Sequence, residues 1–160
     1  MNQIAEAIPR TSPLGNQLIV DFYDCKCAHF DDVEWVENVM IEAANCAGAN
    51  IVEVVFHKFK PRGISGVVVI AESHLAIHTW PEYRYAAIDI FTCGDMLDSE
   101  AAIAHLATRF HSQKRSVTRV DRGRSSELMG YPPTGMDNGP AQERLLAANI
   151  LSQKKYNIEF

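Results

Sequence analysis

Residues 63–94 read GISGVVVIAESHLAIHTWPEYRYAAIDIFTCG and hold most of the information about the fold. Within them, three runs at 67–71, 75–79 and 85–92 are apolar or alternate between apolar and polar residues, and short turn-like segments separate them. Such runs predict three successive β-strands with short connections. The run at 67–71 contains no polar residue, so we expect it to be a buried strand.

The flanking sequence adds two helices and three further strands. We expect strands at 17–22, 50–59 and 115–120, and helices at 33–47 and 98–111, where apolar residues recur at helical spacing. Asp31 and Asp32 precede the first helix and are expected to cap it, and Gly48 follows as a stop signal. Runs of strands rather than strict alternation predict an α+β two-layer sandwich, with a mainly antiparallel sheet and two helices on one face.

The chain divides by composition near residue 121. Its 160 residues suit one domain, and we place a single catalytic domain at 1–121. Residues 122–140 are rich in Gly, Pro, Ser and Asn, and 141–151 could form a short helix. We therefore expect 122–160 to be a loop-rich C-terminal extension.

Composition and charge exclude several classes of protein. A formal net charge of −5 argues against non-specific nucleic-acid binding, which needs a basic surface. No apolar run approaches the roughly 18 residues of a membrane span, and residues 1–13 lack the pattern of a signal peptide. These features predict a cytoplasmic protein with no membrane association.

The cysteines give little support for a metal site. Cys25 and Cys27 form a Cys-x-Cys pair, but no second pair stands at zinc-finger spacing, so we expect reduced thiols and no structural metal. Cys46 lies in the helical pattern of 33–47, and we expect it to fill the core.

Reactive side chains interrupt the apolar strands of 63–94. They are Ser65, Glu72, Ser73, His74, His78, Trp80, Glu82 and Cys93. Composition alone allows a nucleophile elbow, a metal site or a covalent catalytic site. The elbow lacks its Gly-x-Ser-x-Gly spacing, and a metal site on His74 and His78 lacks a third ligand.

Two stretches, HKFKPRGISGVVVIAESHLAIHTWPEY at 57–83 and YAAIDIFTCGD at 85–95, carry a specific resemblance. They resemble the prokaryotic S-adenosylmethionine decarboxylase proenzymes of the short, pyruvoyl-dependent type, over roughly residues 15–120. The resemblance implies that family's fold. It also implies that the chain cuts itself between Glu72 and Ser73, into a β chain of 1–72 and an α chain of 73–160.

The resemblance also implies roles for four residues. The Ser73 hydroxyl attacks the Glu72 carbonyl, and the ester that results leads to a pyruvoyl group at position 73, which is the covalent cofactor. Ser65 supports this processing, and His78 removes the α-proton. The pyruvoyl group then forms a Schiff base with the substrate amine, and Cys93 donates the catalytic proton.

The substrate and the assembly follow from the same resemblance. Phe59 and Trp80 match positions that stack on adenine, and Glu82 matches a polar contact. The implied reaction converts S-adenosylmethionine to S-adenosylmethioninamine for spermidine and polyamine synthesis. It is carried out by a homodimer of processed protomers, (αβ)2, and needs no metal. Arg84 departs from the family pattern, in which a small residue, usually Gly, is expected.

Three alternatives remain open. Relatives that share the chemistry decarboxylate arginine or ornithine, so the substrate could differ. A non-catalytic regulatory subunit could keep the fold, although Ser73, His78 and Cys93 are all present. A metal-binding module would rest only on Cys25, Cys27 and the histidines.

Overall fold

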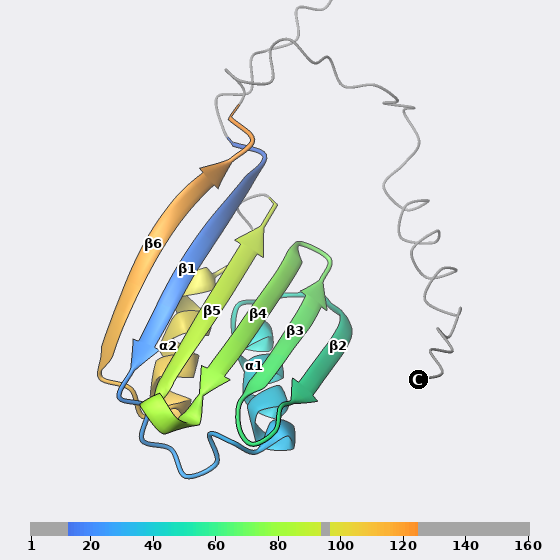
Figure 1. Cartoon of the computed structure of the whole chain (residues 1–160). Helices are drawn as coiled ribbons and strands as arrows, with labels where there is room; N and C mark the ends of the chain where they lie inside the picture. Colours follow the sequence, from blue (N-terminus) through green and yellow to red (C-terminus); the bar gives the residue numbers. More distant parts are fainter. Residues whose placement is uncertain (1–12, 94–96, 125–160) are drawn as a thin grey trace, which may run out of the picture. The chain divides into compact units, whose positions relative to one another are not determined.

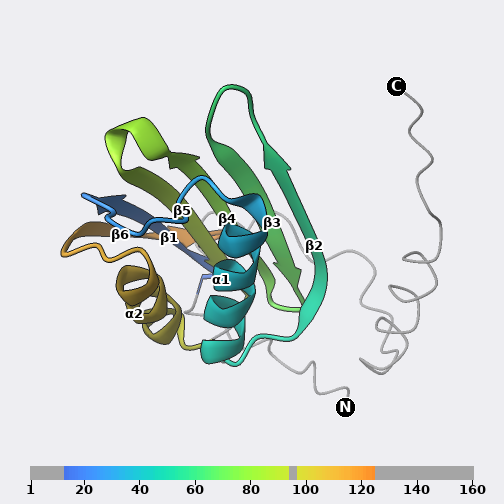
Figure 2. The same ribbon diagram turned by 90° about the horizontal axis from the view of Figure 1, so that it is seen from below.

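A computed structural model of the chain describes residues 13–93 and 97–124, which form one six-stranded sheet and two helices. In chain order the elements are β1 (Gly15–Tyr23), α1 (Val33–Cys46), β2 (Ile51–Lys58), β3 (Ile64–Ile70), β4 (Ser73–Trp80), the 3-10 turn η1 (Pro81–Tyr83), β5 (Tyr85–Thr92), α2 (Ser99–Arg109) and β6 (Lys114–Arg122). The strand order is β2-β3-β4-β5-β1-β6, and every neighbouring pair is antiparallel. Both helices lie against the same face of the sheet, which confirms the predicted two-layer α+β sandwich (Figures 1 and 2).

The core lies between the helices and that face. Along β5 the buried and half-buried positions alternate strictly, as a strand with one covered face requires. The largest fully buried side chains are Phe22, Phe110, Met40, Ile64, Leu75, Ile77, Ile88, Ile90, Ile103 and Leu106. Burying one such side chain contributes about 1.5–3 kcal/mol, so this single cluster holds the helices on the sheet.

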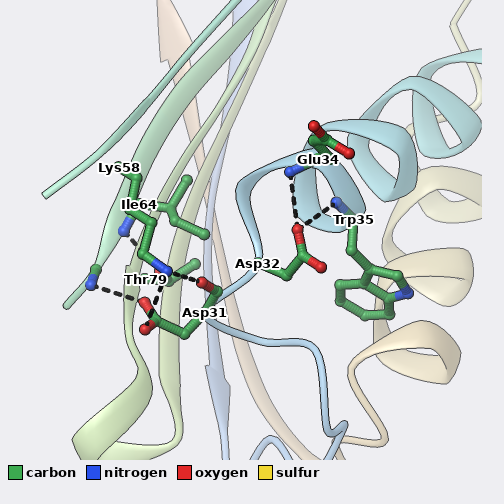
Figure 3. A network of polar contacts seen from close by, with 8 residues as sticks. Asp31, Asp32, Glu34, Trp35, Lys58, Ile64 and Thr79 are labelled. Carbon is green, nitrogen blue, oxygen red and sulfur yellow. Dashed lines mark hydrogen bonds and ion pairs between the residues drawn. The ribbon is translucent and has the colours of Figure 1, made fainter.

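The start of α1 differs in part from expectation. Asp32 is the N-cap, and its Oδ1 accepts from the N–H groups of Glu34 at 3.1 Å and Trp35 at 3.3 Å (Figure 3). Asp31 does not cap the helix. Its carboxylate accepts from Gly63 N–H and pairs with Lys58, because it lies one residue before the cap and turns toward the β2–β3 connection.

Strand β3 begins earlier than predicted. The expected strand at 67–71 is preceded by Ile64, Ser65 and Gly66, which also belong to β3. A Cβ atom at Gly66 would come within 2.1 Å of the Phe56 ring. Glycine is therefore needed here to make room for the side chain of a neighbouring strand, and it does not mark a turn. The expectation that 67–71 is a fully buried strand is wrong. Val67 and Val69 are half-buried because the helices cover only one face, and Ala71 is exposed beyond the end of β3.

Cys46 is exposed, so the prediction that it fills the core is wrong. It is the last residue of α1 and stands outside the helix's buried stripe, 3.7 Å from Nδ1 of His105. Cys25, by contrast, is buried, and burial raises the pKa of its thiol to about 12. Burial also raises the pKa of Cys27.

Two features are absent from residues 13–93 and 97–124. No cluster of three or more His, Cys, Asp or Glu side chains is arranged there to hold a metal ion. Neither helix in this part of the chain is long and apolar enough to cross a membrane. The short helix expected at 141–151 lies outside the described residues, as does most of the extension at 122–160.

Candidate active site

Figure 2 shows that both helices lie on one side of the sheet and leave its other face open. The burial pattern of β4 and the register of its neighbours place several of the predicted site residues on this open face. His74, His78 and Trp80 occupy alternate positions of β4, out of phase with the buried residues of that strand. The antiparallel register places Ser65 opposite His78 and places His57 opposite Ser65. The open face therefore gathers polar and aromatic side chains from three adjacent strands.

One group of predicted residues lies where β4 begins and β5 ends, and we call it the cleavage end. It consists of Glu72, Ser73, His74 and Cys93. The backbone N–H of Cys93 donates to the carbonyl oxygen of Glu72 at 2.9 Å. Ser73 has a φ of 144°, in a region that residues other than glycine rarely adopt. Such backbone conformations cost about 1–3 kcal/mol each. The Glu72–Ser73 bond thus combines a polarised carbonyl with a strained serine.

Two residues at this end were not assigned a chemical role from the sequence. His74 Nδ1 lies 3.3 Å from Ser73 Oγ, and its ring stacks on Phe91 with centroids 5.9 Å apart. Asn50 donates from its side chain to Glu72 Oε1 at 3.1 Å. Only the adjacency of His74 to Ser73 was visible in the sequence, and nothing there pointed to Asn50.

A second group, which we call the aromatic end, consists of His57, Phe59, Ser65, His78 and Trp80. Ser65 Oγ and His78 Nδ1 are 2.7 Å apart. The Trp80 ring lies 6.3 Å from the His78 ring, and Phe59 makes an edge contact with His57 at 4.7 Å. Trp80 and Phe59 remain 40% and 48% exposed, so both rings offer free surface for a ligand.

The two ends are far apart within one chain. His78 follows Ser73 by five positions on the extended strand β4, which at about 3.3 Å per residue separates them by roughly 16 Å. Figure 1 shows the β3–β4 connection and the end of β5 at one end of the sheet, with η1 at the other. Glu82 is exposed on η1 and so lies beyond the aromatic end. The predicted site residues therefore lie in two separate groups within one chain.

Arg84 occupies a left-handed conformation, with a φ of 52° and a ψ of 43°. This geometry explains why a small residue is expected there, because glycine adopts it without strain. The guanidinium pairs with Asp24 at 3.0 Å, and the carbonyl of Arg84 accepts from Cys25 N–H. A hydrogen bond from Lys26 and the charge of Arg84 together lower the pKa of Asp24.

Tyr85 lies between Trp80 and Tyr23 on the open face, with ring centroids 5.4 Å and 5.5 Å away. Its hydroxyl donates to the carboxylate of Asp21. This hydrogen bond, together with partial burial, raises the pKa of Tyr85 to about 12. The phenol is therefore a neutral hydrogen-bond donor at physiological pH.

The cleavage end holds the groups that an attack by the Ser73 hydroxyl on the Glu72 carbonyl carbon would need. Such an attack needs a hydroxyl next to a carbonyl carbon, a donor for the oxyanion and a proton acceptor close to the hydroxyl. Ser73, the Cys93 N–H and His74 supply groups of these kinds at 3.3 Å or less from their partners.

Comparison with known proteins places this chain in a class of decarboxylases. The family model described as S-adenosylmethionine decarboxylase matches residues 16–123. An S-adenosylmethionine decarboxylase proenzyme of Pseudomonas aeruginosa is 51% identical over 131 residues, which cover 81% of this chain and 82% of that protein. Another, from Acidithiobacillus ferrooxidans, is 46% identical over 128 residues, covering 80% and 96%.

A solved structure agrees with the sequence comparisons. The adenosylmethionine decarboxylase of Aquifex aeolicus VF5 superposes with a TM-score of 0.63 at 32% identity, covering 70% of this chain and 92% of that one. The chain belongs to the S-adenosylmethionine decarboxylase family.

Proposed function

We propose that this chain is a proenzyme that cuts itself at Glu72–Ser73 and then decarboxylates S-adenosylmethionine. The observation that carries the proposal is the hydrogen bond from Cys93 N–H to the Glu72 carbonyl, at a bond whose serine has a φ of 144°. Family membership supports the substrate, since the relatives are named for it. The reaction would supply an aminopropyl donor for polyamine synthesis in the cytoplasm.

Cleavage begins with attack by the Ser73 hydroxyl oxygen on the carbonyl carbon of Glu72. The hydroxyl proton passes to His74 Nδ1, which lies 3.3 Å away, and the Cys93 N–H stabilises the negative charge that develops on the carbonyl oxygen. Collapse breaks the C–N bond as the leaving nitrogen takes the proton from His74, and Glu72 stays joined to Ser73 through an ester. Relief of the backbone strain at Ser73 favours this step.

The ester is then opened by β-elimination. A base removes the α-proton of residue 73, and the Glu72 carboxylate leaves with the bonding electrons of the ester C–O bond. Addition of water and loss of ammonia convert the new amino terminus into a pyruvoyl group. We assign the base to His78, whose Nδ1 is held by Ser65 Oγ at 2.7 Å.

The pyruvoyl group supplies a carbonyl for the substrate amine and an adjoining amide that withdraws electrons while carbon dioxide leaves. The chain's own residues then bind the substrate and return a proton to it. We assign that proton to the exposed Cys93 thiol, next to position 73. The exposed rings of Phe59 and Trp80 would hold the adenine, and Glu82 would contact the polar part of the substrate.

These assignments require two copies of the chain. His78 and Trp80 lie roughly 16 Å or more from Ser73 along β4, so one chain cannot present both ends to one substrate. A two-fold axis that runs between two facing sheets and across their strands would put the cleavage end of one copy opposite the aromatic end of the other. The open face carries exposed Ile19, Tyr23 and Val55, apolar surface that such a dimer would cover.

The competing substrates are arginine and ornithine. Arg84 was the departure that left the substrate open, but its guanidinium is paired with Asp24. The exposed Phe59 and Trp80 rings suit a nucleoside better than an aliphatic amino acid. We therefore favour S-adenosylmethionine.

The test is release of labelled carbon dioxide from carboxyl-labelled S-adenosylmethionine, arginine and ornithine by purified protein. We expect release from S-adenosylmethionine alone, and loss of release from Cys93→Ala when activity is counted per cleaved chain. Release from arginine or ornithine alone would keep the chemistry and overturn the substrate. A cleaved chain that acts on none of the three would overturn the enzyme assignment in favour of a regulatory subunit.

A further inference from the structure

We infer that Asn50 is a positioning residue for chain cleavage, and this inference rests on the proposed self-processing. Asn50 holds Glu72, the residue that carries the carbonyl to be attacked. Its Nδ2 donates to Glu72 Oε1 at 3.1 Å, and its backbone N–H donates to Oε2 at 3.4 Å. Both carboxylate oxygens are thereby bound by one residue.

The fold brings Asn50 to this place by joining two turns. The connection from α1 to β2 passes through Gly48, which has a φ of 77°, and reaches Asn50 just before β2. The carbonyl of Asn50 accepts from Ala71 N–H at 2.8 Å, which ties this connection to the one between β3 and β4. The backbone bond aligns the two turns, and the Asn50 side chain then reaches the Glu72 carboxylate.

Glu72 is consequently held from two sides. Asn50 fixes its side chain, and Cys93 N–H fixes its carbonyl oxygen at 2.9 Å. Rotation of the Glu72–Ser73 peptide plane would strain one bond or the other. The carbonyl carbon is therefore kept in one orientation toward the Ser73 hydroxyl, and a fixed orientation of reacting groups accelerates an intramolecular attack.

A purely structural role for the Asn50 side chain would predict that its loss impairs folding. The bond from Ala71 N–H uses the Asn50 backbone, so it survives substitution of the side chain. Asn50 is exposed, so truncating it opens no core cavity. We therefore expect Asn50→Ala to fold normally and to slow cleavage by about tenfold to a hundredfold, the size expected for one hydrogen bond to a charged group.

The experiment follows cleavage of the newly synthesised full-length chain over time by denaturing electrophoresis. It compares the wild type with Asn50→Ala, Glu72→Ala and the double variant, and uses Asn38→Ala, an exposed asparagine of α1, as the matched control. Because Asn50 acts through Glu72, the double variant should be no slower than Glu72→Ala. Asn38→Ala should cut at the wild-type rate.

A pH profile of Asn50→Asp gives a readout that altered folding would not. This variant faces the Glu72 carboxylate with a second carboxylate, so it should cut slowly at pH 7, and the deficit should shrink as the pH falls toward 5 and one group is protonated. Equal rates for Asn50→Ala and the wild type, additive losses in the double variant, or a pH-independent deficit would each overturn the role of Asn50. An uncut wild-type chain would overturn the proposed self-processing itself, and this inference with it.

Discussion

Replacing Asp31 by alanine should weaken the support of the β2–β3 connection that leads to the aromatic end. Asp31 Oδ1 accepts from the N–H of Gly63, a buried residue, at 3.1 Å, and Oδ2 pairs with Lys58 Nζ at 3.3 Å (Figure 3). An orphaned buried N–H costs about 1–3 kcal/mol, and a half-exposed ion pair contributes about 0–1 kcal/mol. We therefore expect Asp31→Ala to lower the free energy of unfolding by about 2–3 kcal/mol.

Two matched variants separate the contributions. Asp31→Asn keeps an acceptor for Gly63 N–H. Lys58→Ala removes the exposed ion pair and the hydrogen bond from Lys58 Nζ to the Asp31 carbonyl but leaves the Gly63 bond, so each variant should cost less than Asp31→Ala, about 1 kcal/mol or less. Urea unfolding should be measured in a Ser73→Ala background, so that every variant is the same uncut chain. A loss below about 0.5 kcal/mol for Asp31→Ala, or equal losses for Asp31→Ala and Asp31→Asn, would refute the role of the Gly63 hydrogen bond.

Three further predictions concern the pKa shifts and the left-handed residue. At pH 8 the Cys25 thiol, with its pKa raised from 9.0 to about 12, should hold about a thousandfold less thiolate than an ordinary thiol. Peptide mapping after iodoacetamide treatment should find it the slowest thiol to react, and rapid labelling in folded protein would contradict its burial. Tyr85→Phe should lower the free energy of unfolding at pH 8, because the raised pKa of Tyr85 marks a neutral phenol stabilised by Asp21. That stability is fully present below about pH 10 and is lost as the pH rises toward 12, so urea curves of the two proteins should converge there, and a constant gap would argue against it. Arg84→Gly relieves the strain of a left-handed backbone but loses the ion pair with Asp24. Its free energy of unfolding should therefore change by less than about 1 kcal/mol, and carbon dioxide release should be retained. A loss of release would show that Arg84 acts at the site.

The fold was largely predictable because a sheet that is covered on one face imposes an alternation of buried and more exposed residues along its strands. Strand β5 alternates buried and half-buried residues along its whole length, and its predicted bounds of 85–92 are those observed. The start of β3 was missed because Ser65 and Gly66 look like turn residues. Gly66 is in fact required by the Phe56 ring on the adjacent strand, and a contact between strands has no signature in the sequence of either strand alone.

The site was predictable in its members but not in its arrangement. The resemblance supplied Ser73, His78 and Cys93, whereas β4 carries His78 five positions along the strand from Ser73. Asn50 was missed because its contact with Glu72 depends on two turns meeting in space. Cys46 was placed wrongly because small residues near a helix end can face either the core or the solvent.

The central claim is that the chain cuts itself at Glu72–Ser73, and the mass of the purified chain under denaturing conditions tests it most directly. The account predicts two fragments, corresponding to 1–72 and 73–160, with no free amino group at the start of the second. It also predicts that Ser73→Ala leaves one uncut chain of about 17.9 kDa. A wild-type chain that remains whole, or a Ser73→Ala chain that is cut at the same place, would contradict the account.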